Sequence, residues 1–176
     1  MDSYMFLNMA ESVDVIKKWC EYYGYGFRKE PGFYKERGDT DNYIYIDDKR
    51  SYRLSEEFDF EELIDSTEDD SYPPYKINVD YNIYMDITGK QSLRETMDGI
   101  NLFFSLAAFV CKSTRSDMLV WFEDGRTLIH RNNDTVFIAE HIVYDPGYSH
   151  EFIEALDFFK DIKYTVIDID KHFGAW

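Results

Sequence analysis

The segment 76–87 alternates apolar and polar side chains more regularly than any other part of the chain. Six apolar side chains, from Ile77 to Ile87, occupy every second position. Successive side chains of a strand point to opposite faces, so a period of two predicts a β-strand with one face in the core. The chain must therefore build a sheet that has a hydrophobic cover on that face.

The following segment, 91–112, has the period of a helix. Ser92 and Glu95 match the S-x-x-E capping box that begins many helices. From Leu93 on, apolar residues recur every three or four positions, at Leu93, Met97, Ile100, Phe104, Ala107 and Cys111. This broad apolar stripe predicts a long helix that lies across the sheet and forms the centre of the core.

The remaining periodic segments complete an α+β pattern. Apolar spacing predicts helices over 11–23 and 149–159, with Gly24 as a stop signal after the first. In the second we expect Ser149 as N-cap and four side chains directed inward, namely Phe152, Ile153, Leu156 and Phe159. Alternation and turn residues predict strands over 42–47, 118–122, 127–131, 135–139 and 164–169, with loops at 144–148 and a tail over 171–176.

The order of these segments favours one α+β domain over residues 1–176. The strands over 118–139 are joined by short turns at Asp124-Gly125 and Asn132-Asn133-Asp134, which is typical of an antiparallel meander. We therefore expect a largely antiparallel sheet of five to six strands. One face is packed by the long central helix and one or two shorter helices.

The charge of the chain restricts its partners. Against 19 Lys and Arg residues stand 35 Asp and Glu residues, giving a net charge of −16 over 176 residues. This balance argues against direct binding of nucleic acid or of an anionic membrane, because both require a cationic face. The 22 residues 54–75 carry nine acids and no Lys or Arg, which is more than half of the net charge.

The acidic segment 54–75 has three interpretations. It is a solvated loop, a cation-binding loop for which the spacing is poor, or a docking surface for a basic protein, with aromatic anchors among its charges. On the third interpretation the partner-contact residues are Phe58, Asp59, Phe60, Glu61, Glu62, Asp65, Glu68, Asp69 and Asp70.

Catalytic and metal-binding patterns are weak in this sequence. The four histidines, at 130, 141, 150 and 172, lack the spacing of metal ligands, and there is no G-x-S-x-G motif. Cys20 and Cys111 fall in predicted helices and are expected to be buried free thiols. We therefore predict no enzyme, no cofactor and no metal. Two carboxylate pairs keep a metal-dependent enzyme open as an alternative, Asp168 with Asp170 and Asp80 with Asp86.

The compartment follows from what the sequence lacks. Residues 1–10 have no basic start and no long apolar run, unlike a secretory signal. The longest apolar-rich run, 100–111, is too short to cross a bilayer, so we expect a cytoplasmic protein.

One family resemblance rests on layout. The strand 77–87, the helix 92–112 and the segment from Asp117 to His130 are similar to an arrangement in small bacterial immunity proteins of polymorphic toxin systems. The resemblance covers about 60 residues and implies a cytoplasmic, non-enzymatic protein that blocks a cognate toxin, such as a basic nuclease, by stoichiometric binding. The alternative is a phage or plasmid antagonist that imitates DNA, for which carboxylates should lie in rows rather than in one segment.

Overall fold

The chain folds as a mixed β-sheet with helices, which confirms the predicted α+β class. The computed structural model describes residues 3–7, 12–31, 42–47, 50–55, 81–87, 93–122 and 126–173, and side chains within 14–28, 94–121 and 126–173. Within these ranges the sheet has nine strands, more than the five to six expected. In their order across the sheet these are β2 (Arg28–Pro31), β3 (Asn42–Asp47), β4 (Arg50–Ser55), β5 (Tyr81–Ile87), β1 (Ser3–Leu7), β6 (Met118–Phe122), β7 (Thr127–Asn132), β8 (Thr135–Ala139) and β9 (Tyr164–Ile167).

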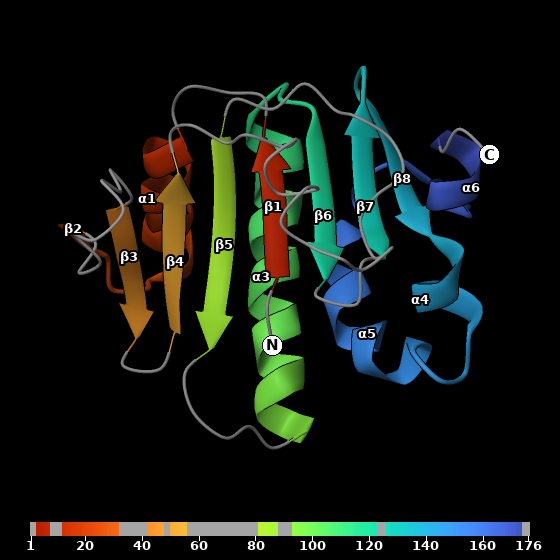
Figure 1. The fold of residues 1–176 in the computed structure, drawn as a ribbon, viewed down its shortest axis with the longest axis horizontal. Helices are drawn as coiled ribbons and strands as arrows, with labels where there is room; N and C mark the ends of the chain where they lie inside the picture. Colours follow the sequence, from red (N-terminus) through yellow and green to blue (C-terminus); the bar gives the residue numbers. More distant parts are fainter. Residues whose placement is uncertain are drawn as a thin grey trace, which may run out of the picture.

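Most neighbouring strands of the sheet also follow one another in the chain, but β1 pairs with β5 and β6, which are far from it in the sequence. Strand β1 lies between β5 and β6, so the first strand of the chain occupies the middle of the sheet (Figure 1). Strand β9 pairs with β8 in parallel, whereas the other neighbours are antiparallel. The expected meander over β6, β7 and β8 is confirmed. Strands β1, β2 and β4 were not predicted.

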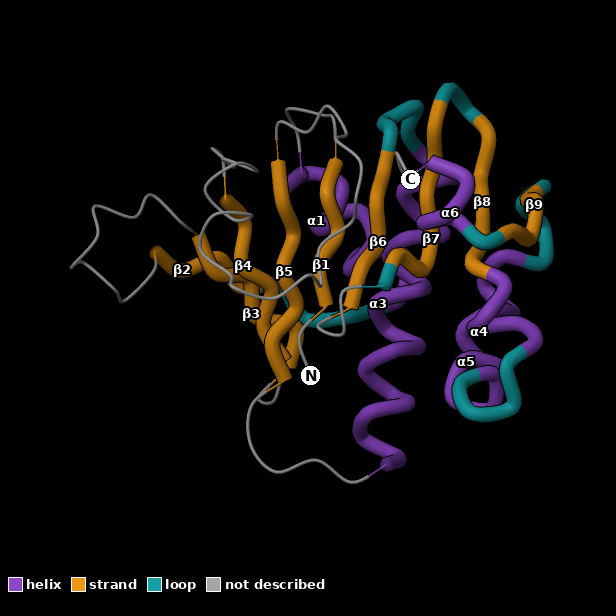
Figure 2. The backbone as a smooth tube through the Cα atoms, turned by 45° about the vertical axis from the view of Figure 1, so that its right-hand side comes forward, coloured by secondary structure: helices purple, strands orange, loops and turns teal. Residues whose placement is uncertain are grey.

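Helices cover both faces of the sheet (Figure 2), which corrects the prediction that they cover one face. Their bounds are Ser12–Tyr23 for α1, Leu93–Ser113 for α3, Glu140–Tyr144 for α4, Ser149–Leu156 for α5, Asp157–Phe159 for the 3₁₀ helix η2 and Ile169–Phe173 for α6. Figure 1 shows α1 and α3 behind the sheet, with α3 behind β1. Helix α6 lies against β7 and β8 on the opposite face (Figure 2).

The core lies between α3 and the sheet. Phe103, Phe104 and Ala107 are fully buried and pack in one cluster with Val120 and Ile129 of the central strands. Helix α5 and η2 close this core at one end, where they contact α3. The alternate residues of β7 and β8 face α6, where the His130 ring lies 4.4 Å from that of Phe173. Both faces of β7 are therefore buried, as its burial pattern shows.

The turn between β7 and β8 forms where the Asn-Asp pair predicted it. Asn133 and Asp134 have φ values of 48° and 64°, the left-handed values that a two-residue hairpin turn with right-handed strand twist requires. Beside it, the buried Arg131 guanidinium donates to the Thr114 carbonyl after α3 at 2.7 Å and pairs with Asp134 at 2.9 Å. This guanidinium therefore ties the hairpin to the carboxyl end of α3.

The C-terminal third corrects four expectations. The 144–148 loop begins only after α4 ends at Tyr144, and the 171–176 tail contains the end of α6. Ser149 is the first residue of α5 and not its N-cap, since Tyr148 holds that position without a side-chain cap. Ile153 was expected to face inward, but it is 64% exposed, because the buried stripe of this helix runs through Phe152 and Ala155.

Candidate functional site

The residues predicted for partner contact lie outside the described part of the chain. This holds for all nine: Phe58, Asp59, Phe60, Glu61, Glu62, Asp65, Glu68, Asp69 and Asp70. It also holds for Asp80 and for the side chain of Asp86. The acidic segment therefore remains a prediction from the sequence.

The Asp168–Asp170 pair does not share a strand face, which corrects the expectation for these residues. Strand β9 ends at Ile167, and Asp168 caps α6 by accepting a hydrogen bond from the Lys171 N–H at 3.1 Å. Asp170 lies in the first turn of α6 and accepts one from the Thr127 N–H at 3.4 Å. Burial raises the pKa of Asp170, while its hydrogen bonds from Thr127 oppose that shift. Among the described residues, no group of three or more potential ligands is placed to hold a metal.

The buried histidine is held neutral. His130 lies under α6, and burial lowers its pKa to about 4, although the negative charge of Asp117 opposes the shift. In contrast, His150 is exposed next to Glu151 at the surface of α5. The ring of His141 lies edge-on to Tyr148, with 5.7 Å between the centroids.

Both cysteines are free thiols, as predicted. Cys20 is buried in α1, and Cys111 is partly buried in α3. Burial raises the pKa of each thiol to about 11. For Cys111, the positive charges of Arg131 and Lys112 offset part of that rise. Neither thiol has the lowered pKa of a reactive nucleophile.

The raised pKa values predict that Cys20 and Cys111 react slowly with thiol reagents in the folded protein. At pH 8 a thiol of pKa 11 is ionised in only about one molecule in a thousand, so the folded protein should react with Ellman's reagent about 100-fold more slowly than the unfolded chain. Two thiols should react at once in guanidinium chloride, which serves as the control. A folded-state rate equal to that of the unfolded chain would contradict the assignment.

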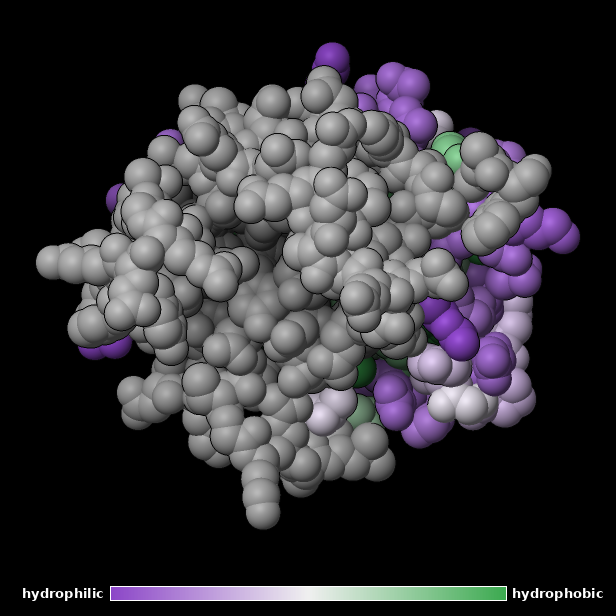
Figure 3. Space-filling model, in the orientation of Figure 1, coloured by the Kyte–Doolittle hydropathy of each residue, from purple (hydrophilic) through white to green (hydrophobic). Residues whose placement is uncertain are grey.

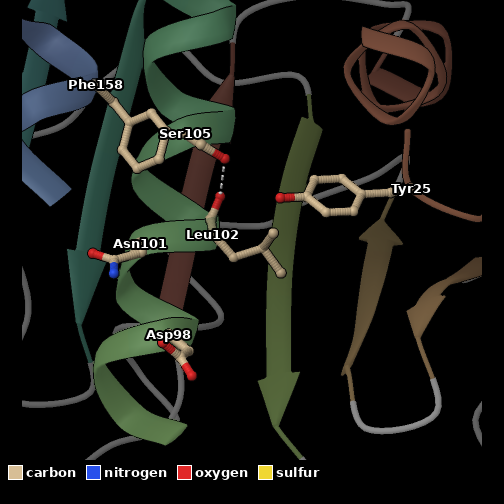
Figure 4. Close-up of a pocket in the computed structure, with 6 residues that line it drawn as sticks. All are labelled: Tyr25, Asp98, Asn101, Leu102, Ser105 and Phe158. Atoms are coloured by element: carbon tan, nitrogen blue, oxygen red, sulfur yellow. Dashed lines mark hydrogen bonds between the residues drawn. The ribbon is translucent and has the colours of Figure 1, made fainter. Parts of the chain in front are cut away.

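A pocket of about 120 Å³ opens between the end of α1, the middle of α3 and η2. We call it the aromatic pocket, and its lining residues are Tyr25, Asp98, Asn101, Leu102, Ser105 and Phe158. Tyr25 reaches toward α3 from one side and Phe158 from the other (Figure 4). The floor belongs to α3, where Leu102 and Ser105 are buried.

The end of α1 places Tyr25 in this pocket. Gly24 has a positive φ of 73°, which allows the Tyr25 N–H to donate to the Cys20 carbonyl at 2.9 Å. This is the 6→1 bond of the Schellman motif, and it turns the chain back over the helix. The ring of Tyr25 then packs on that of Trp19, with 5.2 Å between the centroids.

Polar contacts fix the α3 side of the pocket. The Ser105 hydroxyl donates to the Leu102 carbonyl at 2.7 Å and accepts from the Trp19 indole N–H at 3.1 Å. The Asn101 amide Nδ2 donates to Glu154 Oε2 of α5 at 2.9 Å. Arg94 pairs with Asp98 at 3.0 Å and with Glu154 at 3.4 Å.

An aromatic surface extends from the pocket over α1. Tyr23 stacks on Tyr25 at 5.8 Å and meets Phe158 edge-on at 6.4 Å. Tyr22, which is 74% exposed, contacts both Tyr23 and Phe109. Exposed tyrosines grouped in this way are typical of protein–protein contact surfaces.

The helices after β8 carry a second concentration of acids. Residues 140–161 contain six acids, one Lys and no Arg, and all six acids are exposed or partly exposed. We call them the helical acidic face: Glu140, Asp145, Glu151, Glu154, Asp157 and Asp161. Tyr144 and Ile153 stand among them as large apolar side chains that are 70% and 64% exposed. The region of α4, α5 and α6 is mostly hydrophilic in Figure 3.

Comparison with protein-family models, curated proteins and solved structures gives no match. Function therefore has to follow from the chemistry of the chain's own side chains. None of the helices in the described ranges has the length and apolar character needed to cross a membrane.

Of the helical acidic face and the aromatic pocket, only the first could be recognised in the sequence. The helical acidic face was visible as a charge count over 140–161, because it holds six acids and a single Lys. The aromatic pocket had no comparable signal. Tyr25, Asn101 and Phe158 are far apart in the chain and meet only because α3 packs against α1 and η2.

Proposed function

We propose that this chain is a non-enzymatic, cytoplasmic inhibitor that binds a basic protein stoichiometrically, as an immunity protein binds its toxin. The observation that carries the proposal is the uneven distribution of its negative charge. Residues 54–75 carry nine acids without a base, and residues 140–161 carry six acids against one Lys. The layout resemblance to immunity proteins supports the same class of partner.

Charge and apolar anchors have separate tasks in such a complex. Long-range attraction raises the rate at which oppositely charged proteins meet, whereas buried aromatic groups slow their separation. Phe58 and Phe60 are the proposed anchors within the acidic segment, and Tyr144 and Ile153 stand in the same relation to the helical acidic face.

Three of the described ionisable groups lack the charge that a nucleophile or a general acid needs at neutral pH. Burial raises the pKa of both thiols and lowers that of His130, so each is held in its neutral form at pH 7. The aromatic pocket, at about 120 Å³, is smaller than the roughly 300–1,000 Å³ of a typical small-molecule site.

The partner to test first is the toxic C-terminal module of a secreted protein encoded beside this chain. We expect one equivalent of inhibitor to abolish the activity of the module in a linear titration, because the inhibitor does not turn over. Inactivation by far less than one equivalent would indicate an enzyme instead.

Association kinetics test the role of charge. Reversing four acids together, Asp59, Glu61, Glu62 and Asp65, each to Lys, should lower the association rate constant about tenfold or more at low salt. The wild-type rate should also fall as NaCl rises from about 20 to 150 mM. A matched pair of single variants, Asp65→Lys and Asp14→Lys, controls for net charge, and only the first should slow association. A rate that is independent of both salt and charge reversal would contradict the proposal.

A further inference from the structure

The aromatic pocket has a lining that selects for one kind of ligand. Asn101 Nδ2 donates to Glu154 Oε2. This hydrogen bond fixes which end of the side-chain amide is the nitrogen and points the amide oxygen away from Glu154. That oxygen, Oδ1, is buried without a hydrogen-bond partner among the described residues. The Ser105 hydroxyl uses its one proton on the Leu102 carbonyl, and Asp98 is an acceptor only. Asp98 is the exposed acceptor of this lining, so a ligand that pairs with it must bring hydrogen-bond donors.

The charge beside the pocket is negative. Arg94 is shared by two carboxylates, those of Asp98 and Glu154, so these three side chains carry one uncompensated negative charge. All three are substantially exposed, and ion pairs of this kind are weak enough for an incoming cation to share them. Asp157 and Asp161, with Lys160 between them, add one further negative charge along η2 and the turn that follows it.

The aromatic walls and the small volume narrow the choice of cation. Tyr25 and Phe158 face α3 from opposite sides of the pocket (Figure 4). Aromatic rings attract cations, and the planar guanidinium group stacks on them better than an ammonium group does. A volume of about 120 Å³ suits a side-chain head group and is below the roughly 300–1,000 Å³ of a typical small-molecule site.

We propose that the aromatic pocket receives an arginine side chain of the basic partner. This inference rests on the proposed function for its partner, because a basic protein is the class of molecule that presents exposed arginines. The guanidinium group would lie between Tyr25 and Phe158 and donate to the Asp98 carboxylate. Beside it, the exposed Tyr22, which contacts Tyr23, would extend the contact over α1.

The first experiment uses the isolated protein and no partner. Nα-acetyl-arginine methylamide is titrated into the ¹⁵N-labelled chain, and amide shifts are followed by NMR. We expect saturable shifts confined to the Asn101 side-chain amide and the backbone of 98–105, with a dissociation constant on the order of 1–10 mM. The lysine analogue should bind about threefold or more weakly. Equal binding of both compounds, or shifts spread over all acidic regions, would overturn the assignment to arginine.

Variants separate the pocket from general charge attraction. Tyr25→Leu and Asp98→Asn should each weaken arginine binding about fivefold, because one removes an aromatic wall and the other the carboxylate. Asp14→Asn removes the carboxylate of an exposed residue at the start of α1 and serves as the matched control, with an expected change below about twofold. The urea midpoint of each variant is measured first, so that a loss of binding is compared only between folded proteins.

The second experiment distinguishes this inference from the proposed function. In the complex with the toxic module, the double variant Tyr25→Leu, Asp98→Asn should raise the dissociation rate constant about tenfold or more. If the complex forms and the double variant dissociates like the wild type, the pocket assignment is wrong while the inhibitor function stands. If no basic partner binds but free arginine still occupies the pocket, the proposed function is wrong and the pocket remains a guanidinium site.

Discussion

Replacement of Phe104 by alanine lowers the free energy of unfolding by about 3–5 kcal/mol. Phe104 is fully buried on α3, and its ring lies 5.5 Å from that of Phe152 in α5 and 6.0 Å from that of Phe159 in η2. Removing this ring leaves a cavity where three helical segments meet. The surrounding side chains are held by separate elements, so they collapse into the space only in part.

The measurement is urea unfolding followed by circular dichroism. A domain of this size has a total stability of about 5–15 kcal/mol, so the alanine variant can lie close to the limit of folding. Phe104→Leu provides the graded variant and should cost about half as much, since it keeps most of the buried volume. Phe109→Ala is the control on the same helix, because Phe109 is only partly buried and faces Tyr22. A loss below about 1 kcal/mol for Phe104→Ala would show that α5 and η2 do not depend on this contact.

The same substitution links the core to the aromatic pocket. Phe159 is anchored on Phe104, and its neighbour Phe158 forms one wall of the pocket. Loosening η2 should therefore weaken arginine binding even under conditions where the variant remains folded. The pocket depends on the core through adjacent residues of one short helix.

Sequence reasoning predicted the elements that depend on local chemistry. The apolar stripe of the segment 91–112 corresponds to the buried face of α3, where Ile100, Phe104 and Ala107 are fully buried. The Asn-Asp pair marked the hairpin between β7 and β8 because both residues tolerate positive φ. Gly24 marked the end of α1 for the same reason.

The missed elements depend on long-range partners. Strand β1 is only five residues long, and its place between β5 and β6 is set by pairing with residues about 80 and 115 positions away. Strand β4, with the sequence RSYRLS, has little apolar character and pairs with strands on both sides. Tertiary pairing overrides a weak local preference in both cases.

The Asp168-Ile169-Asp170 segment shows that a D-x-D pattern is compatible both with a strand face and with the start of a helix. A D-x-D segment after an apolar run resembles a strand face, because alternate side chains of a strand share a side. The chain instead leaves β9 after Ile167 and begins α6, for which Asp168 is a preferred N-cap residue. The partly buried position of Asp170 follows from that turn and from the hydrogen bond that its carboxylate accepts from the Thr127 N–H.

The stability of the protein should fall as pH is lowered from 6.5 to 4, with His130 responsible for a defined part of the loss. Its pKa in the folded state is about 4, against 6.5 for an exposed histidine. Between these values the unfolded chain binds a proton that the folded chain does not, so protonation favours unfolding. Integrated over this window, His130 alone removes roughly 3 kcal/mol from the free energy of unfolding.

A His130→Phe variant isolates this contribution, because phenylalanine suits the aromatic surroundings of Phe137 and Phe173. Any hydrogen bond lost in the variant shifts its stability equally at all pH values, whereas the proton-linked part appears only as a difference in slope. We expect the slope of the free energy of unfolding against pH to be lower in the variant by as much as about 1.4 kcal/mol per pH unit near pH 5, which corresponds to one proton.

Asp170 contributes with the opposite sign, since its raised pKa favours the folded state as pH falls. Its contribution is common to both proteins and cancels in the comparison. Parallel profiles for the wild type and His130→Phe would show that His130 can accept a proton in the folded state, and that the space beneath α6 is open to water.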